Sequence, residues 1–364
     1  MIQDTLQLKT LSSTIISLIL ITLSAPSFAQ EGRLIFISEV KGNVKFKQPI
    51  WKSYQTAHGG ELLGGSDKLR LVKGASVKVV CDNLQVWNLN SQGEFEVAKG
   101  CPSSTRPVLK RPGNITSPTR AGNDQKIPYL ISPRNTSIST LQPTLRWNSV
   151  KGATSYQVQI LGPEVDWTTK VNQSEVVYSG NKPLKPGFRY RVIITASNGA
   201  STKDKDNSGF TVLSDADNQR VKTDIVNLQQ QLLSNESKNL ALAHLYRTNN
   251  LNADAIELLE GLTKKGNKTI AVYQLLGNIY QQIGLTELAK ERYLTALKLA
   301  KAENNLAAQA IIQSNLGEVD ITLDQLKQAL QWFQEAQKSY LDLGDETKER
   351  EMQQQVDDLK RRIS

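Results

Sequence analysis

Few residues of this chain have the types and the spacing that catalysis requires. A serine or cysteine nucleophile needs a nearby base such as histidine, and the chain has only two histidines, His58 and His244. Neither lies in a recognisable catalytic motif, and the stretch GGELLGG lacks the lysine and the spacing of a phosphate-binding loop. Glu94 and Glu96 alternate along one stretch, which is compatible with a glycosidase pair but is commoner on a solvated strand. We therefore expect no catalytic residues and no enzyme.

The two cysteines, Cys81 and Cys101, are the other candidates for chemistry. In an exported protein a disulfide is the first hypothesis for such a pair. Closing a loop of about twenty residues would stabilise the fold by about 3 kcal/mol. Two free thiols, or half of a metal site, are the alternatives. A zinc site needs about four ligands, and the scarcity of histidine argues against it. We expect a disulfide between Cys81 and Cys101, no metal and no cofactor.

The first 29 residues have the pattern of a secretory signal. An apolar run from Thr14 to Leu23 precedes a small-x-small motif that ends at Ala29, which is where signal peptides are cleaved. A retained membrane anchor is the alternative, and the shortness of the apolar run argues against it. We predict a signal peptide at residues 1–29, cleavage after Ala29, and a mature protein that is periplasmic or associated with the cell envelope.

The composition of the 364 residues, 39% hydrophobic and 22% charged, is that of two or three modest domains. The charge is uneven, because residues 30–215 carry about 25 basic and 14 acidic side chains and residues 216–364 about 18 and 20. The basic excess would favour an anionic envelope polymer or a membrane surface as a partner. A solubilising surface without a partner is the alternative. Export and the lack of a base-reading motif argue against nucleic acid.

Residues 30–101 are expected to form a small antiparallel β domain, because short alternating apolar runs are separated by glycine-containing turns. The segment resembles the FecR-type domain. The matching positions are Gly42 and Val44, then Gly60, Leu63, Gly65, Asp67 and Leu69, then Gly74, Ala75, Val77 and Val79. FecR-like proteins are linked to envelope sensing through a transmembrane helix and a cytoplasmic segment. We find neither here, so the resemblance implies the β module without the signalling role.

Residues 102–126 are rich in Pro, Ser, Thr and basic residues, which predicts an extended basic linker. Residues 127–213 again alternate as strands do. Tyr190 follows Pro186 in an L-x-P-G-x-x-Y motif, and this segment resembles a fibronectin type III domain with its tyrosine corner. The resemblance implies an all-β sandwich that acts as a spacer or binding module. We expect Trp147 and Tyr156 to lie in its core rather than to stack on a sugar.

Residues 214–364 contain an internal repeat, because Ala255, Ala289 and Ala329 recur at intervals of 34 and 40 residues within similar surroundings. The middle copy resembles the tetratricopeptide pattern, with Tyr273, Leu276, Gly277, Tyr280, Gly284, Ala289, Tyr293 and Ala296 in place. In the third copy Asp320 replaces the usual aromatic residue. The resemblance implies an all-α solenoid with repeats at about 236–269, 270–309 and 310–343. Its helices would pack through Gly277, Tyr280, Ala289, Gly317 and Ala329.

Three further expectations concern the junction before the third copy and the two ends of the solenoid. The six extra residues before the third copy should lengthen the helices on both sides of that junction. A helix with Val221, Ile225, Leu228 and Leu232 at helical spacing should cap the start of the solenoid. The charged segment at residues 344–363 should cap its end, because a solenoid needs polar terminal faces.

Function in tetratricopeptide proteins comes from the concave groove that the first helix of each repeat lines. The register places His244, Arg247, Gln274, Asn278, Gln281, Ser314 and Glu318 there, with Leu240 and Ile321 at matching positions. Asn278 matches the family's frequent groove asparagine, which holds the backbone of a bound peptide. The set lacks the basic clamp of chaperone-binding relatives, so an acidic C-terminus is not the implied ligand. Repeats that serve only for packing or dimerisation are the alternative.

We therefore expect a non-catalytic exported scaffold that binds a protein or peptide partner in this groove and tethers it at the cell envelope. One alternative is a protein that binds envelope glycan or a membrane surface through its basic β-rich half. High salt would release that kind of binding far more readily. A FecR-like component of an envelope sensor is the other alternative.

Overall fold

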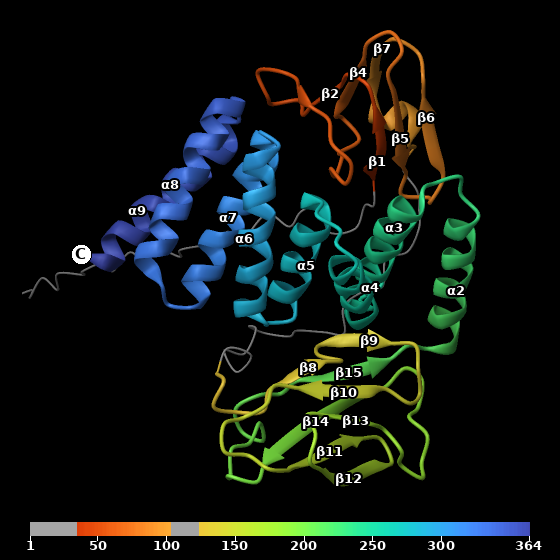
Figure 1. Ribbon diagram of the computed structural model, residues 1–364, viewed down its shortest axis with the longest axis vertical. Coiled ribbons are helices and arrows are strands. Elements are labelled where there is room, and N and C mark those ends of the chain that lie inside the picture. Colours follow the sequence, from red (N-terminus) through yellow and green to blue (C-terminus); the bar gives the residue numbers. More distant parts are fainter. Residues whose placement is uncertain (1–34, 103–123) are drawn as a thin grey trace, which may run out of the picture. The chain divides into compact units, whose positions relative to one another are not determined.

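The computed structural model describes residues 35–102 and 124–364 (Figure 1). The predicted signal peptide and most of the predicted linker lie outside these residues. The described chain forms an N-terminal β domain (residues 35–102), a central β region (124–213) and a helical region (214–364). Within the described ranges, no helix combines the length and the apolar character that crossing a membrane would need.

The N-terminal β domain consists of two antiparallel sheets. One contains β1 (Phe36–Lys41), β5 (Ser76–Val80) and β6 (Val86–Leu89), in that order, and the other contains β3 (Gln55–Thr56), β2 (Val44–Lys47), β4 (Lys68–Leu71) and β7 (Gly93–Glu96). Alternation decides which face is buried, since Val44 and Phe46 lie in the core while Lys45 and Lys47 lie on the opposite face. The predicted small antiparallel β domain is confirmed.

Cys81 and Cys101 form the predicted disulfide, which joins the residue after β5 to the end of the short helix α1 (Val97–Gly100). Two of the FecR-type positions also have a structural explanation. Gly42 has φ +73°, and a Cβ there would lie 3.2 Å from the Cα of Ala75. The buried carboxylate of Asp67 accepts a hydrogen bond from the backbone N–H of Gly64 at 2.8 Å and so closes the turn before β4. Burial raises the pKa of Asp67 to about 6.

The central β region has a sheet of three strands and a sheet of five. The first has the order β13 (Glu175–Val177), β10 (Thr144–Trp147), β8 (Leu130–Ser132). The second has the order β12 (Val165–Val171), β11 (Tyr156–Gly162), β14 (Arg189–Ala196), β15 (Gly209–Val212), β9 (Thr136–Ile138). The β9–β15 pair is parallel and the other pairs are antiparallel.

Three aromatic residues of the central β region are buried in its core, and this position was predicted for two of them, Trp147 and Tyr156. The rings of Trp147 and Tyr156 meet edge to face with their centroids 5.5 Å apart, and both side chains are buried. They are therefore core residues and not a sugar-stacking pair. The hydroxyl of Tyr190 accepts a hydrogen bond from the backbone N–H of Lys185 at 2.7 Å. The hydroxyl thus binds the backbone five residues upstream, within the L-x-P-G-x-x-Y motif.

The helical region comprises three helix pairs with one further helix at each end. The pairs are α3 (Asn235–Thr248) with α4 (Asn252–Lys264), α5 (Ile270–Gln282) with α6 (Thr286–Ala302), and α7 (Leu306–Thr322) with α8 (Leu326–Leu343). The terminal helices are α2 (Asp215–Gln229) and α9 (Glu346–Ile363). The third pair begins at Leu306, a few residues before the expected position. The extra residues lengthen α6 and α7 to 17 residues each, against 13 for α4 and α5.

Glycines allow the two helices of the second pair, and those of the third pair, to approach closely. A Cβ on Gly277 would lie 2.5 Å from the ring of Tyr293, and one on Gly317 would lie 2.6 Å from the ring of Phe333. Tyr280, Ala289 and Ala329 are also buried. At the start of the array, Val221 and Leu228 of α2 are buried, but Leu232 is 89% exposed because it lies beyond the end of the helix. The assignment of Leu232 to the capping helix was wrong.

Asp320 departs from the repeat pattern and has a local explanation. Its buried carboxylate forms an ion pair with Lys290 of α6, with Nζ and Oδ1 2.6 Å apart, and accepts a hydrogen bond from Nε1 of Trp332 at 3.0 Å. A buried charge that is paired and hydrogen-bonded avoids most of the cost of desolvation. An ion pair between neighbouring helices thus replaces the usual aromatic contact.

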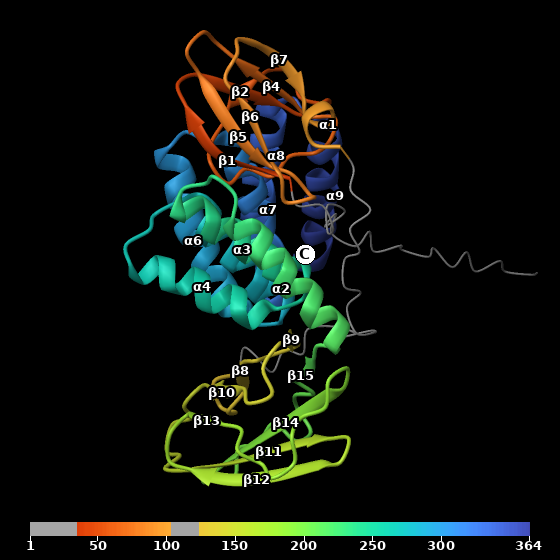
Figure 2. The ribbon, with the colours of Figure 1, turned by 90° about the vertical axis from the view of Figure 1, so that its right-hand side faces the viewer.

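The N-terminal β domain packs against the helical region near the first turn of α3, as Figure 2 shows for β1. Ser237 donates a hydrogen bond from Oγ to the backbone carbonyl oxygen of Ser38 at 2.9 Å. Asn305, which precedes α7, donates from Nδ2 to the carboxylate of Glu61 at 3.0 Å. Phe36 belongs to the same hydrophobic cluster as the helices. These contacts lie between segments far apart in the chain, and the sequence patterns did not predict them.

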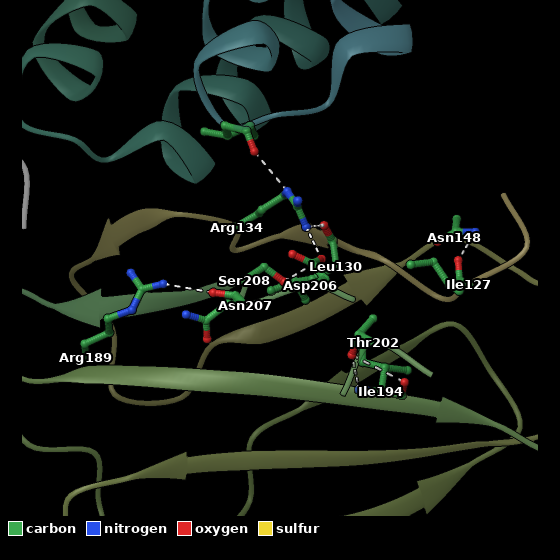
Figure 3. A network of polar contacts seen from close by, with 11 residues as sticks. Ile127, Leu130, Arg134, Asn148, Arg189, Ile194, Thr202, Asp206, Asn207 and Ser208 are labelled. Atoms are coloured by element: carbon green, nitrogen blue, oxygen red, sulfur yellow. Dashed lines mark hydrogen bonds and ion pairs between the residues drawn. The ribbon is translucent and has the colours of Figure 1, made fainter. Parts of the chain in front are cut away.

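The central β region also contacts the helices, at the turns inside the first two pairs. The Oγ1 of Thr136 donates to the backbone carbonyl oxygen of Asn250 at 2.7 Å and accepts from the N–H of Asn252 at 2.8 Å. Arg134 reaches the turn between α5 and α6, where its Nε donates to the carbonyl oxygen of Ile283 (Figure 3). Both β parts are therefore attached to the helical region.

Candidate protein-binding site

The predicted groove positions come from the first helix of each pair, α3, α5 and α7. In α5, the apolar side chains of Leu276 and Ile279 are fully buried, while Gln274, Asn278 and Gln281, spaced four and three residues apart, lie together on another side and are half-buried. We call the predicted set the A-face. It consists of His244, Arg247, Gln274, Asn278, Gln281, Ser314 and Glu318.

The middle of the A-face is a hydrogen-bonded group around Tyr293, whose side chain is buried. Its hydroxyl oxygen lies 2.8 Å from Oδ1 of Asn278 and 2.8 Å from Oε1 of Gln281. Nδ2 of Asn315 donates to Oδ1 of Asn278 at 3.4 Å. The hydroxyl of Tyr293 has one proton, so it can donate a hydrogen bond to only one of the two amides, that of Asn278 or that of Gln281. The remaining amide must then donate to the hydroxyl oxygen through its NH2 group. When Oδ1 of Asn278 accepts, its Nδ2 is left to donate to the backbone carbonyl of a partner.

The first pair differs from the predicted open groove. His244 is buried, and its ring centroid lies 5.2 Å from that of Phe36 of β1. Leu240 is buried as well, next to Gly60 of the same domain. Burial lowers the pKa of His244 to about 3, with a smaller contribution from the charge of Arg247, so the imidazole is neutral at physiological pH. His244 is therefore covered by the N-terminal β domain, which the repeat register alone could not reveal.

The second and third pairs present polar side chains that the rest of the described chain does not use. Gln274, Ser314 and Glu318 are half-buried and make no side-chain hydrogen bond or ion pair with any described residue. Burial raises the pKa of Glu318. A half-buried carboxylate without a cation loses hydration and gains no partner. These groups can therefore accept contacts from another molecule.

One apolar residue of this surface was missed by the sequence analysis. Ile311 lies three residues before Ser314 and seven before Glu318 in α7, which places the three on one side of the helix. Its side chain is 38% exposed, in contrast to the buried Ile312. The helical spacing from Ser314 was the signal that could have identified it. The surface thus combines an apolar side chain, an unpaired carboxylate and neutral amides and hydroxyls.

Glu94, Glu96 and His58, which were considered above for catalysis, lie in the N-terminal β domain. Grouped His, Cys, Asp and Glu side chains that could hold a metal ion are not found within residues 35–102 and 124–364. Glu94 and Glu96, considered above as a glycosidase pair, lie on β7, and Glu94 accepts hydrogen bonds from Lys68 and Arg70 at 2.9 Å each. His58 lies 3.4 Å from the carboxylate of Glu303, and burial lowers its pKa.

Comparison with known proteins identifies the repeats. Residues 268–342 match the tetratricopeptide repeat model. This segment contains α5 to α8, the second and third helix pairs. The first pair departs more from the pattern, and a buried alanine, Ala243, stands where the other two pairs have a glycine. Tetratricopeptide repeats are interaction modules, which makes protein binding the general role of this part of the chain. No curated protein matches the chain.

Several solved structures resemble part of the chain. One is MamA from MSR-1, at 20% identity over 40% of this chain and 90% of that one, with a TM-score of 0.27. Another is a putative kinesin light chain with nearly identical repeats from Podosopora anserina, at 17% identity over 40% and 90%, with a TM-score of 0.29. A third is BtubC from P. vanneervenii, at 18% over 39% and 70%, with a TM-score of 0.29. Because these identities and TM-scores are low, the assignment of tetratricopeptide repeats rests on the match to the repeat model and on the packing of the helices.

Proposed function

We propose that the protein is an interaction scaffold that binds a protein partner on the part of the A-face formed by α5 and α7. The observation that carries this proposal is the set of half-buried polar groups of Gln274, Ser314 and Glu318, which have no partner among the described residues. The packing positions of the same repeats are buried. A partner could form hydrogen bonds with these polar groups and bury the exposed side chain of Ile311 next to them, and both kinds of contact would stabilise a complex.

The chemistry of these residues indicates the kind of segment that would fit. An unpaired Glu318 calls for a lysine or arginine, and Ile311 calls for an apolar side chain nearby. The amide of Asn278 would donate to a backbone carbonyl, as the resemblance to tetratricopeptide proteins implies. The proposed ligand is an extended protein segment that carries a basic residue close to an apolar one. His244 has no part in it, because Phe36 covers it.

We further propose that the protein works outside the cytoplasm, with residues 1–29 as its signal peptide. The disulfide between Cys81 and Cys101 supports this, because such bonds persist in oxidising compartments. In this proposal the FecR-like N-terminal domain and the fibronectin-like central region hold the repeats at the cell envelope. The N-terminal sequence of the protein purified from its native envelope tests the export step. It should begin at Gln30, and recovery with an intact residue 1–29 segment would reject cleavage.

The binding proposal is tested by placing a photo-crosslinking amino acid at position 274 or 314 of the full chain, in its native cells. The matched control position is Gln334, an exposed glutamine of α8 on the other helix of the third pair. We expect one partner, the same by mass spectrometry from positions 274 and 314, and no such product from 334. Equal products from all three positions, or products made only of a second copy of this chain, would reject the proposal.

The full chain is the right material for this experiment. A fragment that begins near residue 216 would remove the N-terminal β domain and expose the side chains that it now covers, including Leu240 and His244. Binding by such a fragment could then reflect newly exposed apolar surface.

A further inference from the structure

A second surface, far from the A-face in sequence, carries an excess of positive charge on one side of a sheet. It lies on β2 and β4, where Val44, Phe46, Leu69 and Leu71 point into the core and the alternate residues point to the other face. We call these four alternate residues the basic face. It consists of Lys45, Lys47, Lys68 and Arg70. The side chains of Lys68 and Arg70 are about half exposed, at 51% and 53%.

The strand register places these cations directly opposite one another. Lys45 pairs with Arg70 and Lys47 pairs with Lys68 across the antiparallel strands. Cross-strand neighbours are separated by roughly 5 Å at Cβ, and residues two apart on a strand by roughly 7 Å. Like charges directly opposite each other destabilise a sheet. Two such pairs side by side cost folding free energy, and a bound anion would remove that cost.

The neighbouring strand β7 neutralises part of this charge, because the register places Glu94 opposite Arg70 and Glu96 opposite Lys68. Two carboxylates against four cations leave the face with an excess of positive charge. Glu94 of β7 accepts hydrogen bonds from both Lys68 and Arg70 at 2.9 Å. Hydrogen bonds from Tyr54, Arg70 and Lys68 lower the pKa of Glu94 to about 2, so it stays ionised. Lys45 and Lys47 form no ion pair with any carboxylate of the described residues; Lys45 donates only to Oγ1 of Thr56, at 3.0 Å.

The basic face borders a pocket of about 400 Å³. It is lined by Lys47, Gln48, Pro49, Tyr54, Ser66, Lys68, Arg70 and by the carboxylate of Glu94. Within it, the guanidinium carbon of Arg70 lies 3.8 Å from the centroid of the Tyr54 ring, and Nζ of Lys47 lies 6.0 Å from the same centroid. These cation–π contacts hold the two cations at the pocket.

We propose that the basic face binds an anionic polysaccharide, with an acidic group of the sugar chain held between Lys47 and Lys68. The pocket is larger than a single small anion needs and falls within the usual range for organic ligands. The amide of Gln48 and the hydroxyl of Ser66 offer hydrogen bonds to sugar hydroxyls, and the hydroxyl oxygen of Tyr54, whose proton goes to Glu94, can accept one. Lysine and arginine supply charge-assisted hydrogen bonds to a carboxylate or a phosphate alike. This site is independent of the A-face and of the partner proposed there.

Calorimetric titration of the full chain tests this site with defined polymers. Polygalacturonate supplies carboxylates, phosphomannan supplies phosphates, and dextran is the uncharged control. The test variant is Lys47→Gln with Lys68→Gln. The control variant is Lys41→Gln with Lys73→Gln, which removes the same charge from exposed lysines elsewhere in the domain. We expect at least one acidic polymer to bind and dextran not to bind. The test variant should weaken binding at least tenfold, and the control less than twofold.

Three outcomes would overturn the proposal. They are an equal loss in both variants, a lack of binding by either acidic polymer, and binding only to phosphatidylglycerol vesicles, which would make this a membrane surface. Lys47→Glu provides a second readout. It should abolish binding while leaving the thermal midpoint unchanged or higher, because it turns the repulsion from Lys68 into attraction. A lower midpoint with retained binding would contradict the argument.

Discussion

Arg134 donates a hydrogen bond from Nε to the backbone carbonyl oxygen of Ile283 at 2.9 Å, although the two residues are 149 positions apart (Figure 3). The same guanidinium lies 2.5 Å from the carboxylate of Asp206, and neither side chain is exposed. Ser208 donates a further hydrogen bond to that carboxylate at 3.0 Å. The central β region thus meets the second helix pair through a buried charge that is neutralised within the β region itself.

Arg134→Ala should destabilise the protein strongly, because it leaves the carboxylate of Asp206 buried without its cation. We expect the free energy of unfolding to fall by about 3–5 kcal/mol. Arg146→Ala is the matched control, since Arg146 and Glu175 form an exposed ion pair in the same region, and it should cost about 1 kcal/mol or less. Urea unfolding of the full chain measures both. A similar fall in the free energy of unfolding for the two variants would show that the buried ion pair stabilises the protein no more than the exposed one.

Gly277→Ala should destabilise the repeats by about 1–3 kcal/mol, because the new methyl group would overlap the ring of Tyr293. Gly261→Ala in α4 is the control, since a Cβ there meets nothing within 4 Å. Alanine at such a helical position should stabilise by up to about 1 kcal/mol. Thermal unfolding should therefore move the two midpoints in opposite directions. A stabilising Gly277→Ala would contradict the packing described for α5 and α6.

The burial of Glu61 should make stability fall as the pH rises from about 4.5 to about 8, although the hydrogen bond from Asn305 acts in the opposite direction on its pKa. Burial raises the pKa of Glu61 from 4.5 to about 8. Its contribution to stability is therefore fully present below pH 4.5 and is lost as the pH rises through about 8. Between pH 7 and pH 9 the free energy of unfolding should fall by about 1 kcal/mol. Urea unfolding at both pH values should show this drop in the natural chain and not in Glu61→Gln. An undiminished drop in the variant would assign it to another group.

The helical repeats could be predicted from the sequence because their determinants are local. Gly277 and Tyr293 lie in one helix pair, and their spacing recurs in Gly317 and Phe333. The β strands followed for the same reason from alternation such as Val44 with Phe46. The positions on the A-face also followed from helical spacing, but their exposure did not. His244 is covered by Phe36, and Arg134 reaches Ile283, through contacts between segments that share no periodic pattern.

Two further features needed the three-dimensional arrangement. Asp320 could be recognised as a departure from the repeat pattern, but its partner Lys290 lies on the preceding helix and became visible only with the helix packing. The basic excess of the N-terminal half was evident from composition. Its concentration on one face required the register that places Lys47 opposite Lys68.

The central claim is that a partner binds the A-face at α5 and α7. Its most direct test is to measure how tightly the partner identified by crosslinking, once purified, binds the purified full chain. Calorimetric titration would compare Glu318→Gln with Asp342→Asn, which removes the charge of an exposed carboxylate on α8. The account predicts binding at least tenfold weaker for Glu318→Gln and unchanged for Asp342→Asn. Equal affinities for the natural chain and both variants would contradict it.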